Sequence, residues 1–280
     1  MSPDAYDRQI AASGLPRLEA RLLMAHASGR SREWLMAHGD EAASAEVTAR
    51  FAQLARRRQA GEPVAYLLGV REFHGIRLQV GPGVLIPRPE TELLVDRAIA
   101  LAPDHATVLD LGTGSGAIAL ALATARDDLR ITATDISPEA LALAQSNAAA
   151  LFGQTARIDW RQGAWWQAIS AAERFALVLA NPPYIRDDDA HLSQDDLRYE
   201  PRLALASGPD GLRDIRQIAQ GAGAHLLAHG WLLIEHGFDQ AAAVRAIFEQ
   251  TGLRDVSSLR DLAGHERITL GRSNPAAHMV

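Results

Sequence analysis

A rigid polar turn follows one of the most apolar segments of the chain. Residues 175–180 read FALVLA, and Asn181, Pro182, Pro183 and Tyr184 come directly after them. Each proline has a locked φ angle and no N–H, so the turn is stiff. The side-chain oxygen of Asn181 and the carbonyl of a proline can each accept one N–H bond, and the Tyr184 ring offers a flat face. The turn therefore predicts a site that holds a planar –NH₂ group.

The chemistry that this turn favours is methyl transfer to nitrogen. A planar amide nitrogen is a weak nucleophile because its lone pair is delocalised, so an enzyme can help by fixing its orientation. The turn offers hydrogen-bond acceptors and a stacking surface, with no thiol, evident base or metal ligand beside them. This set suits methylation of a planar amino group and suits hydride transfer badly. We expect Asn181, Pro182 and Tyr184 to be catalytic and no metal to take part.

A glycine-rich loop supplies the second set of candidate residues. The stretch VLDLGTGSGAIALA predicts a buried strand, a loop and a helix. The loop residues are Gly112, Thr113, Gly114, Ser115 and Gly116. In an open parallel sheet, ligands bind beyond the carboxyl ends of the strands, and glycines there let the backbone approach a ligand closely. Asp135 ends the next strand, where its carboxylate can accept hydrogen bonds from ribose hydroxyls.

Two cofactors fit this loop. The spelling G-T-G-S-G-A satisfies the dinucleotide fingerprint with alanine in the last place, so NAD(P) is a candidate. The D-x-G-x-G-x-G spelling that begins at Asp110 is typical of methyltransferases, and S-adenosylmethionine also carries a ribose for Asp135. The loop favours S-adenosylmethionine and leaves NAD(P) open.

The N-terminal quarter has a different texture from the rest of the chain. Residues 1–75 place apolar residues at helical spacing, as in RLEARLLMAHASG, and predict a small helical bundle. Residues 76–90 predict a β-hairpin linker, with strands at 76–80 and 84–87 on either side of a Gly-Pro-Gly turn.

Residues 91–280 alternate between strand and helix patterns and predict a parallel sheet with helices on both faces. We expect Thr91 to cap the first helix, a later helix over 214–230, and a strand over 231–237. The segment 175–180 is the fourth predicted strand of this sheet. In a doubly wound sheet its carboxyl end lies beside that of the first strand, so the polar turn should lie beside the glycine loop.

Composition narrows the functional classes. The chain has 280 residues, a net charge of −6 and no cysteine. Without cysteine there are no disulfides and no thiolate chemistry, which suits a reducing cytoplasm. The acidic balance disfavours stable binding of nucleic acid. No apolar run approaches the ~20 residues of a membrane span, no signal peptide is visible, and the histidines lack the zinc-type spacing with a carboxylate. We therefore expect a cytoplasmic protein.

Seven segments carry a family resemblance. They read PVAYLLGVREFHG, LIPRPETE, DLGTGSGAIALALA, ATDIS, NPPYI, YEPRLALASGPDGL and IEHG, and they extend over roughly residues 17–271. Together they resemble the HemK/PrmC family of peptide chain release factor glutamine methyltransferases. RPETE favours this family over a close relative that methylates a glutamine of a ribosomal protein. The resemblance implies a class I methyltransferase Rossmann-like sheet that is mostly parallel, with an antiparallel C-terminal strand.

The resemblance also implies roles for the matching residues. S-adenosylmethionine would lie with its methionine part on the glycine loop, its ribose on Asp135 and its adenine on Trp165, and Asn181 would also contact it. Asn181, Pro182, Pro183 and Tyr184 would hold the glutamine amide of a Gly-Gly-Gln motif in release factors one and two. The helical domain, residues 1–75, would dock the protein substrate of a methyltransferase domain at 91–280, and we expect a monomer.

One departure from the family and two alternatives stay open. Ala164 stands where the family often has an acidic residue, so the hydrogen bond to the adenine amino group is missing or comes from elsewhere. Trp165 and Trp166 are both candidates for the aromatic that packs on adenine, and we expect Trp165. An adenine-N6 nucleic-acid methyltransferase would share the polar turn, and an NAD(P)-linked oxidoreductase would share the glycine loop.

Overall fold

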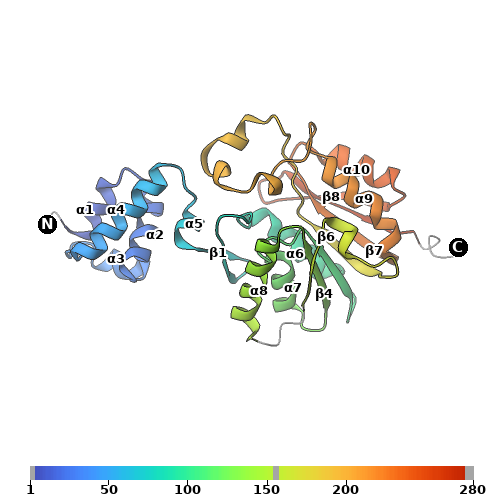
Figure 1. Cartoon of the computed structure of the whole chain (residues 1–280), viewed down its shortest axis with the longest axis horizontal. Helices are drawn as coiled ribbons and strands as arrows, with labels where there is room; N and C mark the ends of the chain where they lie inside the picture. The colour runs from blue at the N-terminus through green and yellow to red at the C-terminus, as the bar shows by residue number, and fades with distance from the viewer. Residues whose placement is uncertain (1–3, 154–157, 275–280) are drawn as a thin grey trace. The chain divides into compact units, whose positions relative to one another are not determined.

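The computed structural model describes residues 4–153 and 158–274, and the chain divides into two compact units. The first unit is Met1–Val70 together with Ser193–Tyr199. The second is Arg71–Leu192 together with Glu200–Val280. Figure 1 labels the α-helices and several of the strands.

The first unit is a small bundle of helices. These are α1 (Tyr6–Ala12), α2 (Arg17–Ser28), α3 (Arg32–Ala37), α4 (Ala45–Gln59) and α5 (Val64–Leu68). The side chain of Ser44 caps α4 by accepting the N–H of Val47, which is the usual role of serine before a first helical turn. Leu23, Met24 and Phe51 are buried in one apolar cluster of the bundle. The predicted helical character of this part of the chain is confirmed.

A short segment from later in the chain belongs to the same unit. Residues 193–199 include the last residue of η4 (Ala190–Ser193) and the whole of η5 (Asp195–Tyr199). Arg58 on α4 donates from Nη1 to the Asp196 carboxylate at 2.5 Å. The Tyr199 hydroxyl donates to the carbonyl of Ala60 at 2.9 Å. These bonds attach the segment to the C-terminal end of α4.

Within the described residues, seven strands of the second unit form one sheet in the order β5-β4-β3-β6-β7-β9-β8. They are β3 (Thr107–Leu111), β4 (Arg130–Asp135), β5 (Ile158–Gln162), β6 (Phe175–Ala180), β7 (Leu226–Glu235), β8 (Arg254–Arg260) and β9 (Glu266–Arg272). The pairs from β5 to β7 are parallel, and β9 is antiparallel to both of its neighbours. This confirms the predicted sheet and its antiparallel C-terminal strand.

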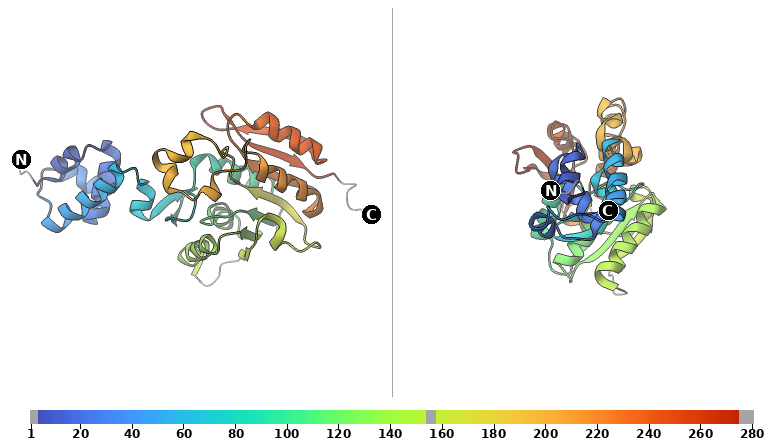
Figure 2. Two further views of the ribbon diagram at one scale, coloured as in Figure 1. Left: turned by 45° about the horizontal axis from the view of Figure 1, so that its top comes forward. Right: turned by 90° about the vertical axis from the view of Figure 1, so that its left-hand side faces the viewer.

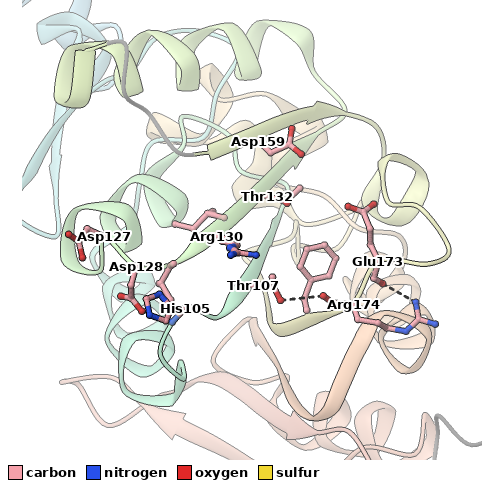
Figure 3. A pocket seen from close by; sticks show the side chains of 12 residues that line it. His105, Thr107, Asp127, Asp128, Arg130, Thr132, Asp159, Glu173 and Arg174 are labelled. Atoms are coloured by element: carbon pink, nitrogen blue, oxygen red, sulfur yellow. Dashed lines mark hydrogen bonds between the residues drawn. The ribbon is translucent and has the colours of Figure 1, made fainter.

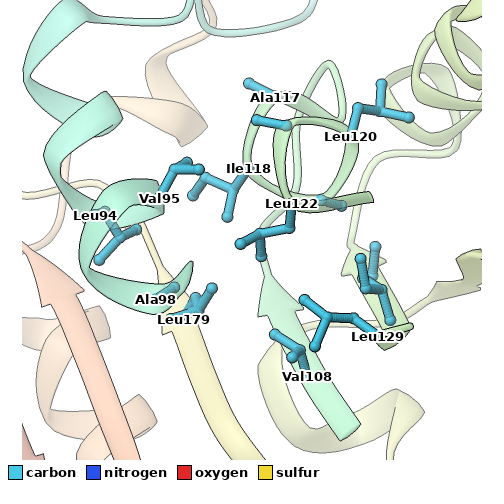
Figure 4. Packing of buried hydrophobic residues seen from close by; sticks show 14 of the residues in the cluster. Leu94, Val95, Ala98, Val108, Ala117, Ile118, Leu120, Leu122, Leu129 and Leu179 are labelled. Atoms are coloured by element: carbon cyan, nitrogen blue, oxygen red, sulfur yellow. The ribbon is translucent and has the colours of Figure 1, made fainter. Parts of the chain in front are cut away.

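Helices cover both faces of the sheet (Figure 2). One apolar cluster contains residues of α6 (Glu92–Leu101), α7 (Ala117–Ala125) and α8 (Pro138–Phe152), and Figure 4 shows Leu94, Ile118 and Leu179 packed within it. The cluster on the other face contains residues of α9 (Arg213–His225) and α10 (Ala241–Gln250). Strands buried on both faces explain why β3 and β6 read as continuous apolar runs.

The hairpin before the sheet lies earlier than predicted. Its strands are β1 (Val70–Phe73) and β2 (Ile76–Gln79), joined at His74 and Gly75, which both have positive φ. The prediction of a second strand at 84–87 is wrong. The N–H of Ile86 donates to the buried carboxylate of Glu200 at 3.0 Å instead of to a neighbouring strand. A side chain from a distant part of the chain therefore takes the place of a ladder partner.

Two predicted boundaries also differ. Thr91 does not cap α6, because a 3₁₀ turn, η1 (Pro89–Thr91), already precedes the helix and the Thr91 hydroxyl donates to Glu235. The helix predicted over 214–230 ends at His225, and β7 begins at the next residue. Leu226 pairs with Phe175 at the start of β6, so strand pairing overrides the helical pattern there.

Candidate active site

A cavity of about 270 Å³ opens at the carboxyl ends of the parallel strands. Its wall comes from the loops after β3, β4, β5 and β6, from segments around Val84 and Leu203, and from α9. The predicted site residues that line it are Gly112, Gly114, Asp135, Trp165, Asn181 and Pro183. The structure thus brings together residues from four separate loops. The predicted site residues outside its lining are Thr113, Ser115, Gly116, Pro182 and Tyr184.

The backbone of the glycine loop can line the cavity directly because Gly112 and Gly114 have no side chains. Gly112 has a φ of 75°, and a Cβ added there would lie 3.1 Å from a ring carbon of Trp165. A side chain at this position would therefore both strain the backbone and press on the aromatic wall. Thr113 points away from the cavity, where its hydroxyl donates to the Asp110 carboxylate at 2.6 Å. Burial raises the pKa of Asp110 to about 7.

Asp135, at the end of the neighbouring strand β4, bonds to the backbone of the glycine loop. One carboxylate oxygen accepts the N–H of Gly114 at 2.8 Å, and the other accepts the N–H of Ser137 at 2.9 Å. Burial raises the pKa of Asp135, and the backbone donors oppose this effect. A carboxylate has about four lone-pair sites, so each oxygen can still accept a hydroxyl. A group with adjacent hydroxyls, such as a ribose, fits this side of the cavity.

The two tryptophans after Ala164 point to different places. Trp165 lines the cavity, and its indole N–H donates to the Asp214 carboxylate at 3.2 Å. Trp166 instead donates to the carbonyls of Gln217 and Ile218 on α9, outside the cavity lining. Trp165 is therefore the aromatic that can face a ligand.

The side of the cavity near α9 holds polar groups that sequence reasoning missed. Asp214 and Gln217 both line the cavity, and they lie on the helix that packs against η3 (Trp165–Ala168). Asp214 is buried and also accepts the hydroxyl of Ser207 at 2.6 Å. These two side chains place hydrogen-bonding groups in the cavity wall beside Trp165. No local motif marks them, because their position depends on how α9 packs.

The polar turn presents one unsatisfied acceptor. The Nδ2 of Asn181 donates to the Thr91 hydroxyl at 3.0 Å, and that hydroxyl donates to Glu235 at 2.6 Å. The Oδ1 of Asn181 is buried and accepts no hydrogen bond from any residue that the structure describes. Because a buried polar atom without a partner is costly, this oxygen is ready to accept an N–H bond from a ligand. Asn181 is also one of the residues that line the cavity.

Backbone hydrogen bonds from other segments fix the rest of the turn. The N–H groups of Tyr184 and Ile185 both donate to the carbonyl of Leu205, at 3.2 and 2.9 Å. The carbonyl of Tyr184 accepts the side-chain amide of Gln240 at 2.9 Å. The Tyr184 ring packs against the apolar cluster of α9 and α10, and burial raises the pKa of its hydroxyl. These contacts fix the direction in which the turn points.

One buried carboxylate connects two segments that border the cavity. Glu200 accepts the N–H of Ile86 and, at 2.5 Å, a guanidinium N–H of Arg88. The side chain of Glu200 is fully buried, while that of Arg88 is partly exposed. Val84 and Pro201 line the cavity within a few residues of these partners. The pairing therefore sets the spacing between the two segments.

A second cavity lies at the opposite edge of the sheet. It has a volume of about 730 Å³ and is lined by residues at or near the starts of β3 to β6, among them Thr107, Arg130 and Asp159 (Figure 3). Although this cavity is larger, none of the predicted site residues lines it. The chemistry predicted from sequence therefore gathers at the carboxyl edge, where open parallel sheets bind their ligands.

The fold and the site residues define a class I methyltransferase. A methyltransferase from Pyrococcus furiosus superposes with a TM-score of 0.54 over 71% of this chain and 90% of that one, at 15% identity. At this identity the likeness concerns the fold alone. A model of the methyltransferase small domain matches residues 89–196, and a model of the PrmC N-terminal domain matches residues 7–69.

The chain belongs to the family of release factor glutamine methyltransferases. The protein of that name from Bordetella pertussis is 52% identical over 264 residues, which cover 94% of this chain and 97% of that protein. The one from Neisseria gonorrhoeae is 48% identical over 268 residues, which cover 95% and 97%. The similarity to these methyltransferases extends over nearly the whole length of the chain. In residues 4–153 and 158–274, no helix is long and apolar enough to cross a membrane.

Proposed function

We propose that this protein transfers a methyl group from S-adenosylmethionine to the side-chain amide nitrogen of the glutamine in the Gly-Gly-Gln motif of release factors one and two. The observation that carries the proposal is the buried, unpartnered Oδ1 of Asn181 at the cavity wall. Membership of the release factor glutamine methyltransferase family supports glutamine as the acceptor.

The residues that line the cavity fit the cofactor. Gly112 and Gly114 would lie along its methionine part with the rest of the loop through Gly116, Asp135 would accept its ribose hydroxyls, and Trp165 would pack on its adenine. When bound, S-adenosylmethionine supplies an electrophilic methyl group on a sulfonium centre. A side chain at Gly112 would press on the Trp165 ring, which lines the same cavity.

The turn would hold the other reactant. Oδ1 of Asn181 would accept one amide N–H and the carbonyl of Pro182 would accept the second, while Pro183 and Tyr184 would keep the turn in place. Two acceptors that converge on one –NH₂ group fix the plane of the amide, so its nitrogen meets the methyl group in one orientation. The nitrogen also loses one proton when it is methylated, and this proton passes to solvent.

The decisive experiment is transfer of labelled methyl groups to a purified release factor. Label should enter the wild-type factor and should not enter a factor whose motif glutamine is replaced by alanine. Label that persisted on the replaced factor would overturn the proposal. A duplex DNA substrate tested in parallel would reveal the adenine-methylating alternative, which must also extrude its target base from the helix. Binding of S-adenosylhomocysteine against NADH tests the oxidoreductase alternative.

Asn181→Ala should separate catalysis from cofactor binding. Loss of the acceptor should lower turnover by about 10²- to 10³-fold, because the amide is no longer oriented at the moment of transfer. The dissociation constant of S-adenosylhomocysteine, measured by calorimetry, should change by only a few fold. Near-normal turnover in this variant would show that Asn181 is not the acceptor.

The roles of the whole protein follow from the same proposal. The N-terminal helical domain, taken as residues 1–75, would dock the release factor, and the domain from residue 91 would carry out the transfer. The net charge of −6 supports a protein partner over a nucleic acid. We expect the protein to act as a monomer in the cytoplasm, where release factors function.

A further inference from the structure

A line of three polar side chains leads from the cavity into the protein. Asn181 follows β6, Glu235 ends β7, and the two strands are paired in parallel with Ala180 opposite Ile234. The sheet therefore places Asn181 and Glu235 side by side. Thr91, from the turn before α6, lies between them and bonds to both, at 3.0 and 2.6 Å.

The inner end of this line decides which way its hydrogen bonds point. When Glu235 is ionised, its carboxylate can only accept hydrogen bonds, so the single hydroxyl proton of Thr91 is directed at Glu235. The Thr91 oxygen is then left with lone pairs alone on its other side. Among the groups of Asn181, only the NH₂ can bond to them.

The orientation of Asn181 matters because its side-chain amide carries an acceptor, Oδ1, on one side and a donor, Nδ2, on the other. With Nδ2 turned to Thr91, Oδ1 is the amide atom that is left without a partner and can accept an N–H bond. With the amide turned over, Nδ2 would face the –NH₂ group of the substrate, and two donors would meet. Thr91 and Glu235 are 3% and 1% exposed, so no solvent competes with their bonds. A hydrogen bond with little solvent access holds its geometry more firmly than an exposed one.

Resting on the function proposed above, we propose that Thr91 and Glu235 are positioning residues that fix the amide of Asn181 with Oδ1 towards the substrate nitrogen. Glu235 sets the direction of the Thr91 hydroxyl, and Thr91 sets the orientation of Asn181. Neither side chain is needed to touch the substrate. The RPETE and IEHG segments would thus act on the reaction through the asparagine of the polar turn.

Thr91→Val tests this inference directly. Valine has nearly the same shape but neither donates nor accepts a hydrogen bond. The side-chain amide of Asn181 therefore loses the hydrogen bond that orients it. Turnover of a release factor should fall about 10- to 100-fold, with little change in the KM for the release factor or in the binding of S-adenosylhomocysteine. Thr91→Ser restores the hydroxyl and should recover turnover to within a few fold of the wild type. A role in folding alone would not separate turnover from these binding constants.

A double variant shows whether Thr91 works through Asn181. In the Asn181→Ala background, Thr91→Val should cause no further loss of turnover, because the group that it orients is absent. Thr132→Val is the matched control, since Thr132 is also buried in this unit but lines the second cavity. It should leave turnover unchanged. If Thr91→Val fails to fold, Thr91→Cys keeps the volume with a poor acceptor and should show the same loss.

The possible outcomes separate the two proposals. No label in the release factor with the wild-type protein would overturn the proposed function, and the positioning role with it. Normal turnover of Thr91→Val, or equal further losses in the two backgrounds, would overturn the positioning role while the proposed function stands.

Discussion

Asp110 and Glu235 are two of the buried carboxyl groups near the carboxyl ends of the parallel strands. Asp110 and Glu235 are 0% and 1% exposed, and burial raises the pKa of each to about 7. Thr113 and Thr91 each donate one hydrogen bond to the ionised form and oppose the shift. Buried ionisable groups that the fold does not need for stability are common at functional sites.

This burial predicts the pH dependence of stability. Glu235 has a higher pKa in the folded protein than in the unfolded chain, where the ordinary value is 4.5. Between about pH 4.5 and 7 the folded state therefore binds more protons, and the free energy of unfolding falls as pH rises. Glu235→Gln removes this contribution, on the order of 2–4 kcal/mol. Urea unfolding of wild type and variant at pH 5 and 8 measures it, and parallel changes in the two proteins would contradict the prediction.

Among the elements, the loop before α9 supports the polar turn most tightly. Gly211 has a φ of 73°, and a Cβ added there would overlap the carbonyl oxygen of Tyr184. Backbone groups cannot yield as a flexible side chain can. The position of the turn therefore depends on the absence of a side chain in a loop about 30 residues further along the chain.

Gly211→Ala should accordingly damage both stability and turnover. The overlap and the positive φ should lower the free energy of unfolding by about 2–4 kcal/mol, and turnover should fall as the turn is displaced. Gly223→Ala is the matched control on α9, because Gly223 is exposed with no atom within 4 Å of an added Cβ. Alanine is the better helix former, so this control should be neutral or slightly stabilising. Thermal unfolding of both variants measures the difference, and similar melting temperatures would refute the overlap.

At the scale of the whole molecule, each of the two units is built from two separate segments of the chain. The polypeptide passes between them after Val70, after Leu192 and after Tyr199. The segment 193–199 thus belongs to the helical unit, although both of its flanks belong to the sheet unit. Arg58 holds it through Asp196 and also donates to Glu19 on α2 at 2.6 Å.

Loss of this attachment should expose the segment. In Arg58→Ala, the bond to Asp196 is gone, and cleavage within residues 193–199 by a low concentration of protease should become roughly two- to tenfold faster, because local opening costs less. Arg56 lies on the same helix with an exposed side chain, so Arg56→Ala should be cleaved at the wild-type rate. Equal rates for the two variants would show that Arg58 does not hold the segment.

Sequence patterns predicted most of the architecture because they are local. The apolar runs of β3 and β6 and the glycine loop can each be recognised from a few consecutive residues. The predictions failed where a distant partner decides the structure. The segment at 84–87 reads as a strand, yet Glu200 binds its backbone. Thr91 reads as a helix cap, yet its hydroxyl bonds to Glu235 and Asn181.

The sequence by itself determined that the polar turn offers amide and carbonyl acceptors to a planar –NH₂ group and that the glycine loop lets a ligand pack closely, and this combination favours methyl transfer. The sequence could not decide which atom of Asn181 faces the cavity, which tryptophan forms its wall, or which unit residues 193–199 join. Each of these depends on side chains far apart in the chain that meet through packing of the sheet, α9 and α4. Only the tertiary structure fixes those meetings, because hydrogen-bond direction and burial are properties of the assembled neighbourhood.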